Sequence, residues 1–156
     1  MNRTMTFNVF FTTTVLCLTA LSLSVEAVEL TQLNDNCLRC ICEAIGNCSN
    51  STKCSGEVCG MFGITWPYWF DSGRPVVPGS DPDDSDAYSK CANDATCAQQ
   101  SVMAYMQRFA LDCNNDGKIN CYDYAAIHKL GRFGCKRPLD DEYRSRYMSC
   151  QLIFKD

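Results

Sequence analysis

The apolar positions of this chain are spaced mainly for helices, and the first helix is predicted over residues 37–45. Leu38 and Ile41 recur there at the interval that places side chains on one face of a helix. Asp35 or Asn36 precedes them and is a residue type that caps a helix N-terminus. Three cysteines fall inside this stretch, at offsets that direct their side chains to different sides of the helix.

Three more helices are predicted downstream, and the strongest pattern lies over residues 98–111. Val102, Tyr105, Met106 and Phe109 share one face of that helix. A stripe of methionine and aromatic side chains at this spacing is typical of a core-facing surface. The other two helices are predicted from about Asp123 to Gly131 and over residues 140–154.

Glycine and proline interrupt the pattern between the first helix and the later ones. Residues 58–66 are predicted to form one or two short strands, broken by Gly60 and Gly63. Four prolines predict an irregular segment after them, at positions 67, 75, 78 and 82. Residues 79–86 carry four aspartates, which favours a solvated surface loop over a calcium loop because the spacing of ligands is poor.

These elements predict one α+β domain that is small and mainly helical, with a short β element near residues 57–70. The chain shows no internal repeat and no linker long enough to separate two domains.

The N-terminus has the composition of a secretory signal peptide, which is predicted to end after Ala27. Arg3 is followed by an apolar run over residues 7–23 and by small residues at the two positions that signal peptidase inspects. A membrane anchor is the alternative, but it needs a longer uninterrupted apolar span. We therefore expect a secreted, extracellular protein with one mature domain over residues 28–156 and no membrane insertion.

The cysteine count supports an extracellular domain. The signal segment contains one of the 13 cysteines, so an even number remains, which in an oxidising compartment indicates six disulfides. Zinc is the alternative, but His128 is the only histidine. A net charge of −4 argues against binding to nucleic acid or anionic membranes. Sequons begin at Asn47 and Asn50, and Asn50 is the better glycosylation candidate because Asn47 adjoins a cysteine.

Residues 112–123 have the ligand pattern of a calcium loop between two helices. Oxygen-bearing side chains stand at loop positions 1, 3, 5, 9 and 12, glycine stands at position 6, and position 7 offers its carbonyl. These candidate metal ligands are Asp112, Asn114, Asp116, Lys118, Asn120 and Asp123. The pattern resembles the loops of EF-hands and dockerin modules. It favours a structural calcium ion and no cofactor for chemistry, with a metal-free turn shaped by Cys113 and Cys121 as the alternative.

A further pattern joins the cysteines to an aromatic run. It reads Cys37-x-x-Cys40-x-Cys42, then Cys48, Cys54 and Cys59-Gly60, then the run ITWPYWFDSGRP from Ile64 to Pro75, and later Cys91-x-x-Asp94-x-x-Cys97. Over nearly all of the mature chain this resembles the invertebrate-type lysozymes, the destabilase family. Many members have cysteine at the positions of Ser72 and Ser101, so one whole bridge is expected to be missing here.

The resemblance implies a lysozyme-like fold and a particular set of disulfides. Three are between near neighbours, and we expect three more to join distant parts of the chain. The expected pairs are Cys42 with Cys48, Cys54 with Cys59, Cys91 with Cys97, Cys37 with Cys121, Cys40 with Cys150, and Cys113 with Cys135.

The resemblance also locates the catalytic carboxylates. In active members the general acid is a glutamate three residues after the third cysteine, and its partner is an aspartate three residues after the fifth. In this sequence those positions hold Ile45 and Glu57. Glu43 is the only carboxylate near the acid position, and two residues along a helix rotate it by about 200° from the required direction. Glu57 and Glu43 are therefore the candidate catalytic residues, with Ile45 in the place of the acid.

The function that the resemblance implies is a glycoside hydrolase that cleaves bacterial peptidoglycan, in an antibacterial or digestive role. Because a retaining hydrolase needs two carboxyl groups, Ile45 predicts weak or lost muramidase activity. Trp66, Tyr68 and Trp69 are candidates for stacking on sugar rings, with packing in the core as the alternative. The alternative function is a non-catalytic lysozyme-like protein that binds a glycan, a bacterial surface or a partner protein. For the isopeptidase activity of some destabilases, the spacing identifies no nucleophile and base.

Overall fold

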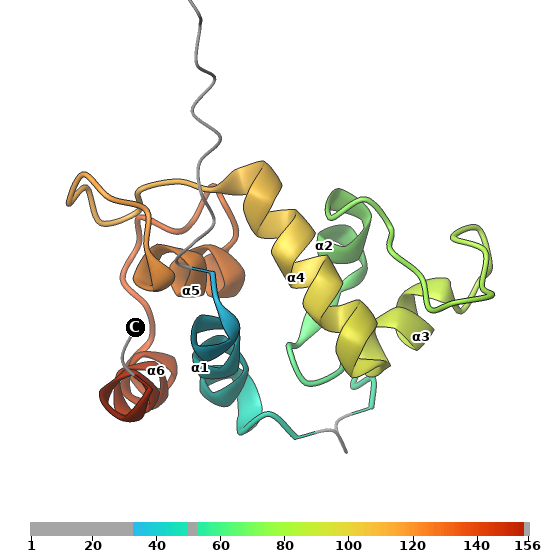
Figure 1. Cartoon of the computed structure of the whole chain (residues 1–156), viewed down its shortest axis with the longest axis horizontal. Helices are drawn as coiled ribbons and strands as arrows, with labels where there is room; N and C mark the ends of the chain where they lie inside the picture. The colour runs from blue at the N-terminus through green and yellow to red at the C-terminus, as the bar shows by residue number, and fades with distance from the viewer. Residues whose placement is uncertain (1–32, 50–52, 155–156) are drawn as a thin grey trace, which may run out of the picture.

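The computed structural model describes residues 33–49 and 53–154, which form a mainly helical domain with a small sheet (Figure 1). The predicted signal peptide and the sequon at Asn50 lie outside these residues. Within the described ranges, no helix is long and apolar enough to cross a membrane. The elements are α1 (Asp35–Gly46), β1 (Val58–Cys59), β2 (Ile64–Thr65), α2 (Trp66–Asp71), α3 (Ala87–Asn93), α4 (Ala95–Phe109), α5 (Cys121–Leu130) and α6 (Asp141–Ile153). The predicted fold class is confirmed.

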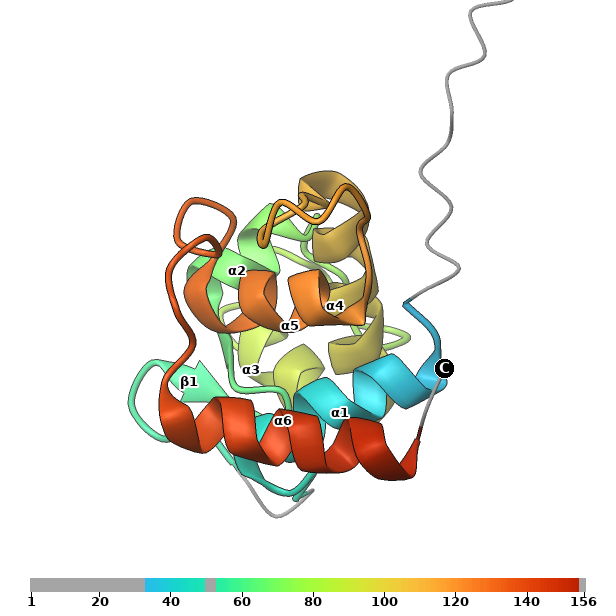
Figure 2. The ribbon, with the colours of Figure 1, turned by 90° about the vertical axis from the view of Figure 1, so that its left-hand side faces the viewer.

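Helix α1 begins two residues before the predicted start. Its cap is Asn34, not Asp35 or Asn36, because the Asn34 side-chain oxygen accepts a hydrogen bond from the Cys37 backbone N–H at 2.9 Å. The helix ends at Gly46, and its C-cap Asn47 adopts the left-handed conformation at φ 56°. Helix α6 lies along one side of α1, as Figure 2 shows.

Three disulfides leave α1 in different directions and attach it to distant parts of the chain. Cys37 is bonded to Cys121 at the start of α5, and Cys40 is bonded to Cys150 in α6. The third α1 cysteine is bonded to the loop that follows the helix. The six pairs are those that the family resemblance implies: Cys37–Cys121, Cys40–Cys150, Cys42–Cys48, Cys54–Cys59, Cys91–Cys97 and Cys113–Cys135.

The prediction of an irregular segment from Pro67 onward is wrong over its first part. Pro67 lies in the first turn of α2, where its missing N–H leaves no helical hydrogen bond unmade. The Thr65 hydroxyl caps this helix by accepting from the Tyr68 backbone N–H at 3.4 Å. Helix α3 was also not predicted, because it is short and buries only small residues, namely Ala87, Cys91 and Ala92.

The two strands form an antiparallel hairpin that pairs Val58 with Thr65 and Cys59 with Ile64. Its turn lies directly against α3. Gly60 has a φ of +72°, and a Cβ atom placed there would lie 1.6 Å from the Ala92 carbonyl oxygen. Only glycine permits both this conformation and this approach, so Gly60 determines where the hairpin sits on the helical part of the domain.

His128 of α5 ties the hairpin turn to α2. Its Nε2 lies 2.7 Å from the Phe62 carbonyl oxygen and its Nδ1 lies 3.1 Å from the Tyr68 hydroxyl. Because a carbonyl can only accept, Nε2 carries the proton and the neutral ring accepts from Tyr68 at Nδ1. Burial lowers the pKa of His128 to about 4; the hydrogen bond to Phe62 opposes this shift, and the charge of Lys129 adds to it. The ring is therefore uncharged at neutral pH.

The lowered pKa of His128 predicts a loss of stability in mild acid. Below about pH 6.5 the unfolded chain binds a proton at His128, whereas the folded protein does not. The free energy of unfolding therefore falls. The fall is complete near pH 4, where folded His128 also protonates, and it amounts to about 3 kcal/mol at most. Urea unfolding between pH 7 and pH 4 measures it. A His128→Gln variant should show a clearly shallower pH dependence, and equal slopes in the two proteins would contradict the assignment.

Candidate functional site

Ile45, which stands where the family resemblance implies the general acid, lies near the C-terminal end of α1, and its side chain packs on the hairpin. A Cβ atom added to Gly63 would lie 3.2 Å from Cγ2 of Ile45 and 3.4 Å from Cγ1 of Val58. These distances place the half-buried Ile45 side chain against Gly63 and Val58 of the hairpin, and it also packs against the core of the domain. The position that faces the hairpin therefore holds an aliphatic side chain without a proton to donate.

Glu57 stands immediately before β1, with its side chain exposed to solvent. The Tyr88 hydroxyl of α3 lies 2.9 Å from the Glu57 carbonyl oxygen and 2.6 Å from that of Ile64, and it donates to this pair. Burial raises the pKa of Tyr88, and the negative charge of Glu57 raises it further. The negative charge of Glu57 therefore makes the Tyr88 phenol, beside the hairpin, harder to ionise.

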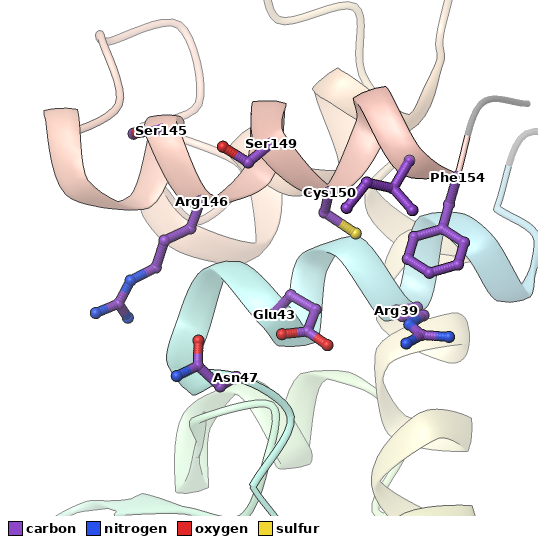
Figure 3. Close-up of a pocket in the computed structure, with 9 residues that line it drawn as sticks. Arg39, Glu43, Asn47, Ser145, Arg146, Ser149, Cys150 and Phe154 are labelled. Atoms are coloured by element: carbon purple, nitrogen blue, oxygen red, sulfur yellow. The ribbon is translucent and has the colours of Figure 1, made fainter.

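Glu43 lies on another side of α1 and faces α6, as the rotation between neighbouring helical positions predicts. It lines a groove together with Arg39 of its own helix and Arg146 of α6 (Figure 3). Glu57 instead belongs to the hairpin, beside Tyr88 of α3. The structure thus separates the two candidate carboxylates and does not place Glu43 where Ile45 stands.

The three aromatic candidates differ in exposure. Trp69 is only 2% exposed, and its indole N–H donates to the Pro75 carbonyl at 2.7 Å. Tyr68 stacks on Tyr105 at 3.8 Å between ring centroids and donates to His128. Both side chains are therefore packing residues. Trp66 is 52% exposed, the most exposed of the three, and offers the largest surface to a ligand from solvent.

Trp66 borders a cleft of about 370 Å³ between α2 and the aspartate-rich loop before α3. Phe70, 48% exposed, stacks on Trp66 with the ring centroids 5.1 Å apart. Arg74 donates to the Pro82 carbonyl and to the Asp83 carboxylate, which joins the two walls of the cleft. An exposed aromatic pair beside a guanidinium and carboxylates offers both stacking and hydrogen bonding to a polar ring.

The sequence alone does not indicate all of this cleft. Phe70 and Arg74 lie in the same aromatic run as Trp66, but their exposure depends on α2, which was not predicted. The loop over residues 79–86 is exposed, as predicted, yet it also forms one wall of the cleft. The alternation of proline and aspartate there carried no signal for this contact, because the contact is made by Arg74.

The structure does not support the predicted calcium site at residues 112–123. The described residues contain no group of three or more His, Cys, Asp or Glu side chains that could hold a metal ion. Asp123 is fully buried, and its two carboxylate oxygens accept from the backbone N–H groups of Cys113 at 2.8 Å and Asn120 at 2.9 Å. Asp123 is therefore part of the capping box of α5.

The remaining side chains of this loop are occupied in the same way. The carboxylate of Asp112 accepts from the backbone N–H groups of Asp116 at 3.2 Å and Gly117 at 2.9 Å. Asp116 accepts from the Lys118 backbone and from the Asn114 side-chain amide, both at 2.9 Å. These hydrogen bonds lower the pKa of Asp116. The aspartates and asparagines thus close the turn on itself, and Cys113–Cys135 anchors one end of it.

The role of Asp123 can be tested by substitution. Asp123→Asn replaces one acceptor oxygen with a donor that faces a backbone N–H, so we expect a loss of about 2 kcal/mol in the free energy of unfolding. The loss should be the same in EDTA and in millimolar calcium. Asp112→Asn, at a position that is only half-buried, should cost clearly less. Stabilisation of the unmodified protein by calcium, abolished by both substitutions, would contradict this account.

The helices, the short hairpin and the six disulfides define a small disulfide-rich domain of the lysozyme-like class. A model of the family described as Destabilase matches residues 34–150. The chain therefore belongs to the destabilase family, that of the invertebrate-type lysozymes.

Individual relatives support this assignment. A lysozyme of Magallana gigas is 36% identical over 110 residues, which cover 68% of this chain and 72% of that protein. Invertebrate-type lysozyme 3 of Caenorhabditis elegans is 30% identical over 133 residues, 83% and 94% of the two chains. Among solved structures, the complex of Meretrix lusoria lysozyme with Aeromonas hydrophila PliI matches with a TM-score of 0.59 at 32% identity, covering 74% of this chain and 88% of the other.

Ser72 and Ser101, at the positions where the family resemblance implies an additional bridge, are both buried. Each hydroxyl donates within its own segment: Ser72 to the Trp69 carbonyl at 2.7 Å, and Ser101 to the Cys97 carbonyl at 3.0 Å. Neither side chain leaves an unpaired polar group in the core, so the domain accommodates serine at both positions.

Proposed function

We propose that this protein is a secreted member of the lysozyme family that binds bacterial cell-wall glycan and has weak or no muramidase activity. The observation that carries the proposal is the packing of Ile45 against Gly63 and Val58. This is the position at which the family resemblance implies the general acid. The N-terminal signal pattern supports secretion, and the net charge of −4 argues against nucleic acid as a partner.

Cleavage of a glycosidic bond by the lysozyme mechanism needs a carboxylic acid to protonate the leaving oxygen and a carboxylate to attack or stabilise the sugar cation. Glu57 can supply the carboxylate, although it is one methylene longer than the aspartate that the family implies. Ile45 cannot supply the proton, and Glu43 faces α6. The leaving group would therefore depart unprotonated, which removes a contribution of typically 10²- to 10⁴-fold in rate.

Binding does not require the missing acid. The cleft beside Trp66 and Phe70 supports glycan recognition, because an apolar sugar face stacks on exposed aromatic rings while the hydroxyls pair with polar groups. Arg74, Asp83 and Asp84 are at hand for the hydroxyls. The retained Glu57 favours a second candidate, a slow hydrolase, and the experiment below separates the two.

Restoring the acid should restore hydrolysis. We expect the unmodified protein to clear suspensions of bacterial cell walls at or near background and Ile45→Glu to raise the rate by about 10²-fold. The apolar contacts of residue 45 would hold the new carboxyl protonated near neutral pH, as a general acid requires. Turbidity of a cell-wall suspension measures the rate.

Glu57→Gln is the matched control. In the unmodified background it should change the rate little, and in the Ile45→Glu background it should remove the gain. Clear lysis by the unmodified protein that disappears in Glu57→Gln would overturn the proposal and identify the protein as an active hydrolase.

Trp66→Ala should weaken binding to insoluble peptidoglycan and to chitin oligosaccharides about tenfold, since it removes the exposed stacking surface. Phe133→Ala is a suitable control, because Phe133 is 90% exposed and does not line this cleft. Pull-down and calorimetric titration measure the affinity. Equal affinities of the two variants would place the glycan elsewhere on the protein.

A further inference from the structure

The groove between α1 and α6 is a second cavity with the character of a ligand site, and its volume is about 430 Å³. The disulfide Cys40–Cys150 joins the two helices at this groove, so its walls are covalently held together. The lining residues are Arg39, Glu43, Asn47, Ser145, Arg146, Ser149, Cys150, Ile153 and Phe154. Neither Glu57 nor Trp66 is among them, so the groove is separate from the proposed glycan cleft.

Charges alternate along this groove, as Figure 3 shows. Glu43 projects into it from α1, with Arg39 on one side and Arg146 on the other. Arg39 is held over the Phe154 ring at 4.1 Å, and Nη2 of Arg146 is held by Glu142 at 2.6 Å. A guanidinium has five N–H donors, so each of these arginines keeps donors for a ligand after its protein contact.

The Glu43 carboxylate is left for a ligand as well. Among residues 33–49 and 53–154, no hydrogen bond or ion pair reaches it. A half-buried carboxylate that lies between two arginines without pairing with either offers a place for one cationic group, with an anionic group on each side of it.

We propose that the groove between α1 and α6 binds a short peptide in which one ammonium group stands between two carboxylates, with the ammonium on Glu43 and the carboxylates on Arg39 and Arg146. Ile153 and Phe154 form an apolar wall that accommodates alkyl groups of the peptide. Ser145 and Ser149 also line the groove and offer hydroxyl groups to the peptide backbone. Each charged group of the ligand therefore meets a group of opposite charge in the groove.

The spacing of the site fits a peptide. Arg39 and Glu43 are one helical turn apart, which corresponds to about 6 Å along α1. An extended peptide advances about 3.3–3.6 Å per residue, so a carboxylate and an ammonium on neighbouring or next-neighbouring residues reach both groups. The stem peptides of bacterial cell walls have this chemistry where a D-glutamate, a diamino acid and a C-terminal carboxylate follow one another. Free peptides of the same composition share it.

The test uses the purified mature protein, residues 28–156, and the synthetic stem pentapeptide L-Ala-γ-D-Glu-L-Lys-D-Ala-D-Ala, which carries no sugar. Calorimetric titration should detect binding, and Glu43→Gln should weaken it about tenfold or more. Acetylation of the lysine side chain should weaken binding to the unmodified protein by a similar factor and leave the affinity of Glu43→Gln unchanged. Equal losses on acetylation in both proteins, or no binding of the pentapeptide, would overturn the proposal.

Matched substitutions on α6 test the arginine contacts. Arg146→Gln should weaken pentapeptide binding several-fold, whereas Arg144→Gln should leave it unchanged, because Arg144 pairs with Asp141 and does not line the groove. Equal effects of the two substitutions would contradict a specific contact.

Two sources of the peptide are distinguished with intact peptidoglycan and with glycan strands stripped of their peptides. Capture of the intact polymer that depends on Glu43 assigns the groove to cell-wall stems, and binding of the free pentapeptide alone assigns it to soluble peptides. Trp66→Ala should weaken the capture of stripped strands without changing pentapeptide affinity. Loss of glycan binding at the cleft beside Trp66 is therefore measured separately from loss of peptide binding in the groove beside Glu43.

Discussion

The disulfides that leave α1 in three directions are the constraint on which the rest of the domain depends. Cys37–Cys121 and Cys40–Cys150 close loops of 84 and 110 residues, the longest separations among the six bridges. Closing long loops removes the most conformational entropy from the unfolded chain in the entropic account of disulfide stability. Because bonded sulfurs leave the helix on several sides, α1 cannot rotate about its own axis. Each of its other side chains therefore faces one fixed part of the domain.

This fixed orientation turns residue 45 and Glu43 toward different neighbours. Ile45 faces the hairpin, whereas Glu43 faces α6. A carboxyl group at position 45 would have to be held among apolar neighbours, at a cost in stability, while isoleucine gains from the same contacts. Isoleucine at position 45 therefore favours the stability of the fold, whereas a general acid there would favour catalysis. The hairpin, the cleft beside Trp66 and the groove beside Glu43 do not depend on a residue-45 carboxyl to form.

Much of the architecture could be predicted from local pattern, and the failures have physical causes. The helices around Leu38 and Met106 follow from apolar spacing, with bounds that differ by a few residues at each end. Pro67 was interpreted as a breaker, but in the first turn of α2 its missing N–H is harmless. In the sequence, Asp123 fits position 12 of a calcium loop. In the fold, its carboxylate caps α5 from within the core.

The sequence by itself determined the family and the disulfide pairs that the family implies, and it places Ile45 where the resemblance implies the acid, since these follow from identity and spacing along the chain. Only the tertiary structure decided which aromatic residues are exposed, what Asp123 binds, and that Glu43 stands between Arg39 and Arg146. The physical reason is that burial and pairing depend on residues far apart in the chain. Trp66 and Trp69 differ by three positions and are the same residue type, but only their neighbours in space make one a packing residue and leave the other open to a ligand.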